Sequence, residues 1–89
     1  MPLYSPVPER KVLDMEKALI LITLRLESSS NLVEQLRAIK GVKDAALIYG
    51  PYDAYATVET PDKEGLWETL TKIRAIHGVH STLTCNAVR

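Results

Sequence analysis

What this 89-residue chain lacks excludes several classes of protein. Its single cysteine cannot form an internal disulfide and suits a reducing compartment, so we expect a cytoplasmic protein. With 11 basic and 11 acidic residues the charge is balanced, so the chain has no electrostatic attraction for DNA or RNA. No apolar run approaches the ~20 residues that span a bilayer, and the N-terminus has no signal-peptide pattern. We therefore expect no membrane segment.

Catalytic and metal-binding signatures are equally scarce. The sequence has no nucleophile elbow, Walker loop or glycine-rich dinucleotide fingerprint. His77, His80 and Cys85 are the nearest approach to a ligand set for a metal, but their predicted directions diverge and no carboxylate has a matching spacing. We expect no catalytic residue, no metal site and no cofactor, and therefore a protein that is not an enzyme.

The chain divides into an arm and one folded domain. Residues 1–17 are predicted to be an N-terminal arm, because three prolines exclude helix and central strand and the rest is charged. Val12 and Leu13 are its expected packing contacts. Residues 18–89 form the domain.

Four strands and two helices are predicted within that domain. Residues 18–26 are an almost unbroken apolar run, typical of a central strand buried on both faces. Strands are also predicted over 42–49, 52–60 and 79–88. Between them lie two helical patterns, which Gly41 and Gly78 end. Asn31 with Glu34 resembles a capping box for the first helix, and Thr60-Pro61 resembles the start of the second.

The order strand, helix, strand, strand, helix, strand contains an internal repeat. Leu32, Glu34, Leu36, Ile39 and Gly41-Val42 reappear as Leu66, Glu68, Leu70, Ile73 and Gly78-Val79. Two βαβ halves joined by a hairpin predict an α+β, ferredoxin-like βαββαβ sandwich. In this fold the antiparallel four-stranded sheet has two helices on one face, with the first and third strands central.

Strict alternation along the strands sorts their side chains into two faces. The apolar face, which the helices should cover, comprises Ile20, Ile22, Leu24, Ala46, Ile48, Ala54, Ala56, Val58, Leu83 and Cys85. The other comprises Leu19, Leu21, Thr23, Arg25, Leu47, Tyr49, Asp53, Tyr55, Thr57, Glu59, Thr82, Thr84 and Asn86. Because no helix remains to cover this second face, a sheet-to-sheet homodimer of the dimeric α/β barrel type is expected.

The hairpin at Gly50-Pro51-Tyr52-Asp53 is the strongest candidate for a binding site. It presents backbone amides, an aromatic wall and a carboxylate that could pair with the ammonium group of a small amphoteric ligand. Thr82 and Thr84, two apart on the last strand, point their hydroxyls the same way. The alternative is that Asp suits turns and threonine suits strands, with no ligand involved.

Three short motifs in this order resemble the effector domain of the Lrp/AsnC (feast/famine) transcriptional regulators, often called the RAM domain. They are Gly-x-Tyr-Asp at 50–53, Gly-Val at 78–79 and Thr-x-Thr at 82–84, and the resemblance covers residues 18–89. It implies homodimers that assemble into rings of four or five dimers, an octamer or decamer, with an amino acid or related small metabolite bound between dimers. Carried over, the ligand contacts are Gly50, Tyr52 and Asp53, with Thr82 and Thr84 as further candidates.

The chain departs from those regulators at its N-terminus. Seventeen residues before the first strand cannot form the three helices of a helix-turn-helix domain, so no direct DNA binding is expected. The resemblance then implies a stand-alone effector module, which senses a metabolite by itself or co-assembles with a full-length Lrp/AsnC regulator.

Three alternatives remain open at this point. One is an ACT-like amino-acid-sensing regulatory subunit of a metabolic enzyme, although Ser-Ser-Ser-Asn at 28–31 replaces the usual glycine-rich turn. Another is a small dimeric α+β-barrel enzyme. The third is a purely structural oligomerisation module.

Overall fold

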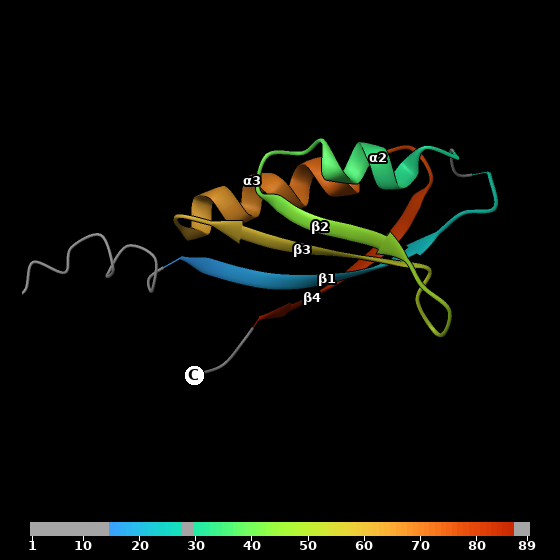
Figure 1. Ribbon diagram of the computed structural model, residues 1–89, viewed down its shortest axis with the longest axis horizontal. Coiled ribbons are helices and arrows are strands. Elements are labelled where there is room, and N and C mark those ends of the chain that lie inside the picture. Colours follow the sequence, from blue (N-terminus) through green and yellow to red (C-terminus); the bar gives the residue numbers. More distant parts are fainter. Residues whose placement is uncertain (1–14, 28–29, 87–89) are drawn as a thin grey trace, which may run out of the picture.

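The computed structural model describes residues 15–27 and 30–86, so most of the predicted arm, including Val12 and Leu13, lies outside the described residues (Figure 1). Its elements follow the predicted order: β1 (Glu16–Leu24), α2 (Leu32–Arg37), β2 (Val42–Leu47), β3 (Ala54–Thr60), α3 (Lys63–Arg74) and β4 (Val79–Asn86). β1 begins two residues before the predicted start of the domain at residue 18. The predicted ferredoxin-like fold is confirmed.

The four strands form one antiparallel sheet in the order β2-β3-β1-β4. β1 and β3 are central, as predicted. The expected burial of β1 on both faces is wrong for the single chain, because Leu19 is 38% exposed on the face without helices. Both helices lie on the same side of the sheet, and the β2–β3 hairpin projects from one end (Figure 1). The opposite side of the sheet has no helix over it among the described residues.

The core lies between the sheet and the helices. Its largest fully buried side chains are Ile20, Ile22, Leu36, Val58 and Ile73. Burying a side chain of this size contributes about 1.5–3 kcal/mol, so this aliphatic layer is the main source of stability. Neither helix has the length and apolar character to cross a membrane within the part of the chain described.

Both helix starts differ from the prediction. Asn31 precedes α2 but makes no capping bond with its side chain; its Oδ1 accepts a hydrogen bond from Gln35 Nε2 at 2.8 Å instead. Asp62, rather than Thr60, caps α3, because its Oδ1 accepts from the backbone N–H of Gly65 at 2.8 Å. Thr60 Oγ1 donates to the carbonyl of Asp62 and so supports the turn before the cap.

The internal repeat is clearest where each helix ends. Residues 37–42 and 74–79 both read Arg-Ala-Ile-x-Gly-Val, and each glycine has a positive φ, 102° and 100°. In each copy the valine N–H donates to the isoleucine carbonyl, Val42 to Ile39 at 3.1 Å and Val79 to Ile76 at 3.2 Å. Ile39 therefore corresponds to Ile76, not to Ile73.

A β-bulge follows each of these turns and reverses the predicted faces of both edge strands. Lys43 is the extra residue in β2, since Val42 pairs with Val58 and Asp44 with Thr57. His80 is the extra residue in β4, where Val79 pairs with Leu24 and Ser81 with Thr23. One extra residue moves every later side chain to the other face.

The corrected assignments follow from pairs that directly face each other. In β2, Ala45 rather than Ala46 is buried under the helices, opposite Ala56, and Leu47 lies on the same side. In β4, Thr82 and Thr84 lie on the helix side, opposite Ile22 and Ile20. Leu83 and Cys85, predicted to be covered by the helices, lie on the helix-free side opposite Leu21 and Leu19.

The helix-free side, termed the open face below, is consequently more apolar than predicted. Its centre consists of Leu19, Leu21, Ala46, Leu83 and Cys85, with Tyr55 and Thr57 beside them. Leu19 is 38% exposed and Leu83 46% exposed. Contiguous apolar surface of this kind marks an interaction surface.

Candidate functional site

The β2–β3 hairpin loop, residues 48–53, is held at its base. Ile48 N–H donates to the carbonyl of Asp53 at 2.9 Å. Gly50 has φ 137°, a conformation that side-chain-bearing residues rarely adopt, and a Cβ added there would meet no atom within 4 Å. Gly50 is therefore required by the turn and not by packing.

Asp53 ties the loop to the central strand β1. Its N–H donates to the carbonyl of Ile22 at 2.9 Å, and its Oδ2 accepts from the N–H of Leu24 at 2.7 Å. The carboxylate thus satisfies a backbone group where the β1 pairing shifts at the bulge. Asp53 is exposed, and its Oδ1 makes no hydrogen bond to another described residue.

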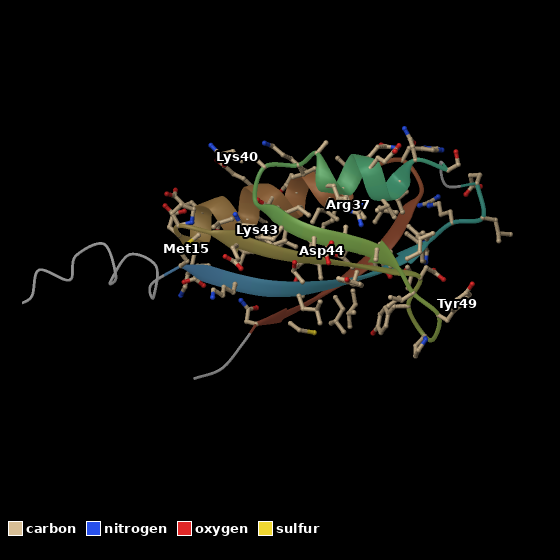
Figure 2. All side chains as sticks on the ribbon, in the orientation of Figure 1. Met15, Arg37, Lys40, Lys43, Asp44 and Tyr49 are labelled. Carbon is tan, nitrogen blue, oxygen red and sulfur yellow. The ribbon has the colours of Figure 1, made fainter. Side chains whose placement is uncertain are left out.

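A hollow of about 460 Å³ opens beside this carboxylate and is termed the hairpin hollow. It is lined by Leu24, Arg25, Leu26, Leu47, Ile48, Tyr49 and Asp53. Arg25 and Asp53 are its two charged side chains, and four of the others are aliphatic. Leu26 and Tyr49 are fully exposed, and Tyr49 lies on the hairpin at the end of the molecule opposite Met15 (Figure 2).

Sequence reasoning missed Arg25 as a site residue and assigned it only to a face of the sheet. Its backbone N–H donates to the carbonyl of Gly78 at 2.7 Å, which fixes where the chain leaves β1. A usable signal existed: in the predicted topology the first and third strands are antiparallel neighbours, so the end of one adjoins the start of the other. A basic residue at the end of β1 thus lies near Asp53.

The predicted site residues fall into two groups. Gly50, Tyr52 and Asp53 lie together in the hairpin loop, and of these Asp53 lines the hairpin hollow. Thr82 and Thr84 lie on the edge strand β4, on its helix side. Within one chain the structure therefore does not bring the threonines to the hairpin hollow.

The hydroxyl groups of Thr82 and Thr84 differ in their hydrogen bonding. Thr82 Oγ1 accepts from Arg74 Nε at 3.1 Å. The guanidinium of Arg74 also lies 5.8 Å from the ring centroid of Trp67, which is 62% exposed. Thr84 Oγ1 is buried and has no hydrogen-bond partner among the described residues.

A second cluster of polar side chains, Arg37, Asp44 and Tyr55, lies at the edge strand β2. Arg37 Nε and a terminal guanidinium nitrogen donate to the carbonyl of Ala45 at 3.2 and 2.8 Å, and the same nitrogen lies 3.8 Å from Asp44 Oδ1. Tyr55 donates from its hydroxyl to Asp44 Oδ2 at 3.0 Å. This hydrogen bond, helped by the negative charge of Asp44, raises the pKa of the Tyr55 phenol.

In the described ranges 15–27 and 30–86, no group of three or more His, Cys, Asp or Glu side chains is arranged to hold a metal ion. His77, His80 and Cys85 form no such group there.

Comparisons with known proteins agree with this geometry. A Thermus thermophilus protein of known structure is 32% identical, with a TM-score of 0.76, over 83% of this chain and 94% of its own. Escherichia coli AsnC, 22% identical, has the same fold, with a TM-score of 0.73 over 100% of this chain and 60% of its own.

Among curated proteins, the homocitrate synthase of Sulfurisphaera tokodaii is 39% identical over 67 residues. That match covers 72% of this chain and 15% of the synthase, so the chain spans only a small part of this relative. The profile of the Lrp/AsnC ligand binding domain matches residues 17–89. The chain therefore belongs to the Lrp/AsnC ligand-binding domain family, whose members are regulatory ligand-binding modules.

Proposed function

We propose that this chain is an effector-binding and oligomerisation module that takes up an amino acid, or a related small metabolite, at the hairpin hollow. One observation carries the proposal: Arg25 and Asp53 place opposite charges on a hollow of about 460 Å³ whose other walls are mainly apolar. A free amino acid has the matching chemistry, since it carries an ammonium group, a carboxylate and a side chain on one carbon.

Each part of the ligand has an available partner. Asp53 Oδ1, which no described residue occupies, accepts from the ammonium group, while Oδ2 keeps the loop in place. Arg25 binds the carboxylate through its planar guanidinium. Leu24, Leu26 and Leu47 receive an apolar side chain.

Gly50 and Tyr52 lie in the loop that carries Asp53 but do not line the hollow, and in this proposal their amide and ring contact the ligand from the loop. Thr82 and Thr84 contribute only from another copy of the chain, because within one chain they lie on the far side of β1. The fully exposed Leu26 and Tyr49 beside the hollow support closure of the site by such a copy.

Assembly is the second half of the proposed function. The apolar centre of the open face supports a face-to-face homodimer, which removes Leu19, Leu21 and Leu83 from water. Dimers joined at their hairpin ends give the ring, an octamer or decamer, that the family resemblance implies.

Two regulatory roles fit such a module. One is co-assembly with a full-length Lrp/AsnC regulator, whose DNA contacts the metabolite would then influence. The other is service to a metabolic enzyme, and a specific finding favours it: the region similar to this chain makes up 15% of a homocitrate synthase. A catalytic role for this chain has less support, because the matching family profile is that of a ligand binding domain.

A thermal-shift screen of the amino acids, with native mass spectrometry, tests the proposal. At ~100 times Kd a ligand stabilises the folded state by about 2.7 kcal/mol, which raises the Tm of a domain this size by roughly 10–20 °C. We expect one class of amino acid to do so, and Arg25→Gln to abolish the shift. If no amino acid moves the Tm, or if Arg25→Gln keeps the shift, the site is not the hairpin hollow.

A further inference from the structure

A second cavity lies at the opposite end of the sheet from the hairpin hollow. It has a volume of about 370 Å³ and is lined by Met15, Lys40, Gly41, Lys43, Glu59, Thr60, Pro61, Gly65, Glu68, Thr69 and Lys72. We term it the lysine cavity. Lys40 and Lys43 lie with Met15 at this end of the molecule, away from Tyr49 (Figure 2). Asp53 precedes β3 and Glu59 lies near its end, so about 20 Å of strand separates the two sites.

The three lysines come from three different elements. Lys40 lies in the turn after α2, Lys43 is the bulged residue of β2, and Lys72 lies near the end of α3. A bulge changes the direction of the side chain at the extra residue. The bulge therefore contributes Lys43 to this cavity, whereas a regular strand would assign it to one face of the sheet.

The turn that carries Lys40 and Lys43 is fixed in place. Thr69 Oγ1 lies 3.1 Å from the carbonyl oxygen of Lys40 and 3.0 Å from that of Gly65, and its one proton is shared between these two acceptors. Glu59 N–H donates to the carbonyl of Gly41 at 2.9 Å. A Cβ at residue 41 would lie 2.6 Å from Thr69 Oγ1, so only glycine permits this approach. Hydrogen bonds therefore hold the backbone of this turn, while the three lysine side chains are exposed.

Three lysines and two glutamates line this cavity, which leaves it with a net charge of +1. No ion pair joins any of the three lysines to Glu59, Glu68 or another residue that the structure describes; the recorded pair is Arg37 with Asp44. Lys40, Lys43 and Lys72 line one cavity, and a bound dianion reduces the repulsion between their like charges. Glu59 and Glu68 leave the cavity with a net positive charge and can accept hydrogen bonds from hydroxyl or amino groups of a ligand.

We propose that the lysine cavity binds a small dianionic metabolite, one that carries two carboxylates or a phosphate, as a second input separate from the hairpin hollow. Lys40, Lys43 and Lys72 hold the anionic groups. The volume of about 370 Å³ accommodates a small metabolite but not a polymer.

The test is an NMR titration of the whole chain with inorganic phosphate and with succinate, each at constant ionic strength balanced by chloride. The amides of Gly41 and Gly65, both lining the cavity, report binding. We expect saturable shifts at these two amides. Binding of either dianion supports the proposal, and the tighter one identifies the preferred anionic group.

Charge-removing variants separate a site from general attraction. Lys43→Gln and Lys72→Gln should each raise the dissociation constant of the dianion about tenfold, as expected for loss of one charge-assisted hydrogen bond. Lys63→Gln, which removes the same charge from an exposed α3 position outside the cavity, should change Kd less than about twofold. Absence of saturation, or equal losses in all three variants, overturns the proposal. Arg25→Gln should retain dianion binding, so failure of the amino-acid site is distinguishable from failure of this one.

Discussion

At the scale of single residues, Asp53 illustrates how one side chain serves two purposes. Oδ2 is committed to the N–H of Leu24 at 2.7 Å, so the residue stabilises the hairpin with or without a ligand. Sequence reasoning set a structural role against a ligand-pairing role for this carboxylate. The hydrogen bond of Oδ2 establishes the structural role, and Oδ1 is available for the ligand-pairing role.

Substitution of Asp53 separates these roles. Asp53→Ala leaves the Leu24 N–H without its acceptor and should destabilise the free chain by about 1–2 kcal/mol. Asp53→Asn keeps an acceptor of the same shape, so it should lower the free energy of unfolding by less than half as much. It should still lose the amino-acid-induced Tm shift, because the negative charge is gone. Thermal melts with and without ligand give both numbers. A full ligand-induced shift in Asp53→Asn would make Asp53 purely structural.

Tyr55 offers a pH-dependent prediction. Its hydrogen bond to Asp44 raises the pKa of the phenol in the folded chain above the ordinary value of 10.0. A raised folded-state pKa means that the bond stabilises the fold below pH 10 and that this contribution disappears as the pH rises through the higher folded value. We expect Asp44→Asn to lower the pKa of Tyr55 in an NMR titration. An unchanged titration curve would contradict the assigned cause.

At the scale of elements, the repeated Arg-Ala-Ile-x-Gly-Val segments define both edge strands. Each segment ends a helix, turns through a glycine with positive φ and produces a bulge at the residue after its valine. The arginines of the two copies act differently: Arg37 covers a backbone carbonyl at the edge of β2, whereas Arg74 bonds the Thr82 side chain. Edge strands expose unpaired backbone groups, and Arg37 satisfies one of these on β2, whereas Arg74 satisfies a side chain on β4.

Gly41 and Gly50 are a matched pair for separating backbone strain from steric clash in a turn. Both have positive φ, but a Cβ at residue 41 would lie 2.6 Å from Thr69 Oγ1, whereas at residue 50 it would meet nothing within 4 Å. Gly50→Ala should cost about 1 kcal/mol from backbone strain alone. Gly41→Ala should cost at least about 1 kcal/mol more, because it adds a clash with a buried side chain. Chemical denaturation measures both, and equal losses would refute the close approach.

At the scale of the whole molecule, helices cover one face of the sheet, and no described element covers the other. Because Leu83 and Cys85 turn toward the open face, the apolar area available for association includes part of the edge strand β4. Within residues 15–27 and 30–86 nothing covers this surface, and association at the open face is the simplest way to bury it.

A charged residue introduced at the centre of the open face tests whether the homodimer forms there. Leu21→Lys should dissociate the chain into folded monomers, since a buried unpaired ammonium group is strongly unfavourable. Trp67→Lys, on the exposed side of α3, introduces the same charge and should remain dimeric. Light scattering with circular dichroism distinguishes dissociation from unfolding. A monomeric wild-type chain would show that the open face does not pair.

The sequence by itself determined the order of the elements, the central position of β1 and β3, and the hairpin at Gly50-Pro51. Each of these depends on local signals: apolar runs, helical spacing and turn residues. The family resemblance depended on motifs in the same turns, and it was confirmed by the match over residues 17–89.

Tertiary structure alone decided which face each edge strand presents and which residue caps α3. Alternation is counted along one strand, whereas the bulges at Lys43 and His80 are features of the pairing with β3 and β1, so counting along the strand does not register them. Thr60 and Asp62 are both suitable caps by residue type, and the choice follows from how α3 meets the end of β3. Arg25 and Asp53, 28 positions apart in the chain, line the same hollow because the end of β1 adjoins the start of β3.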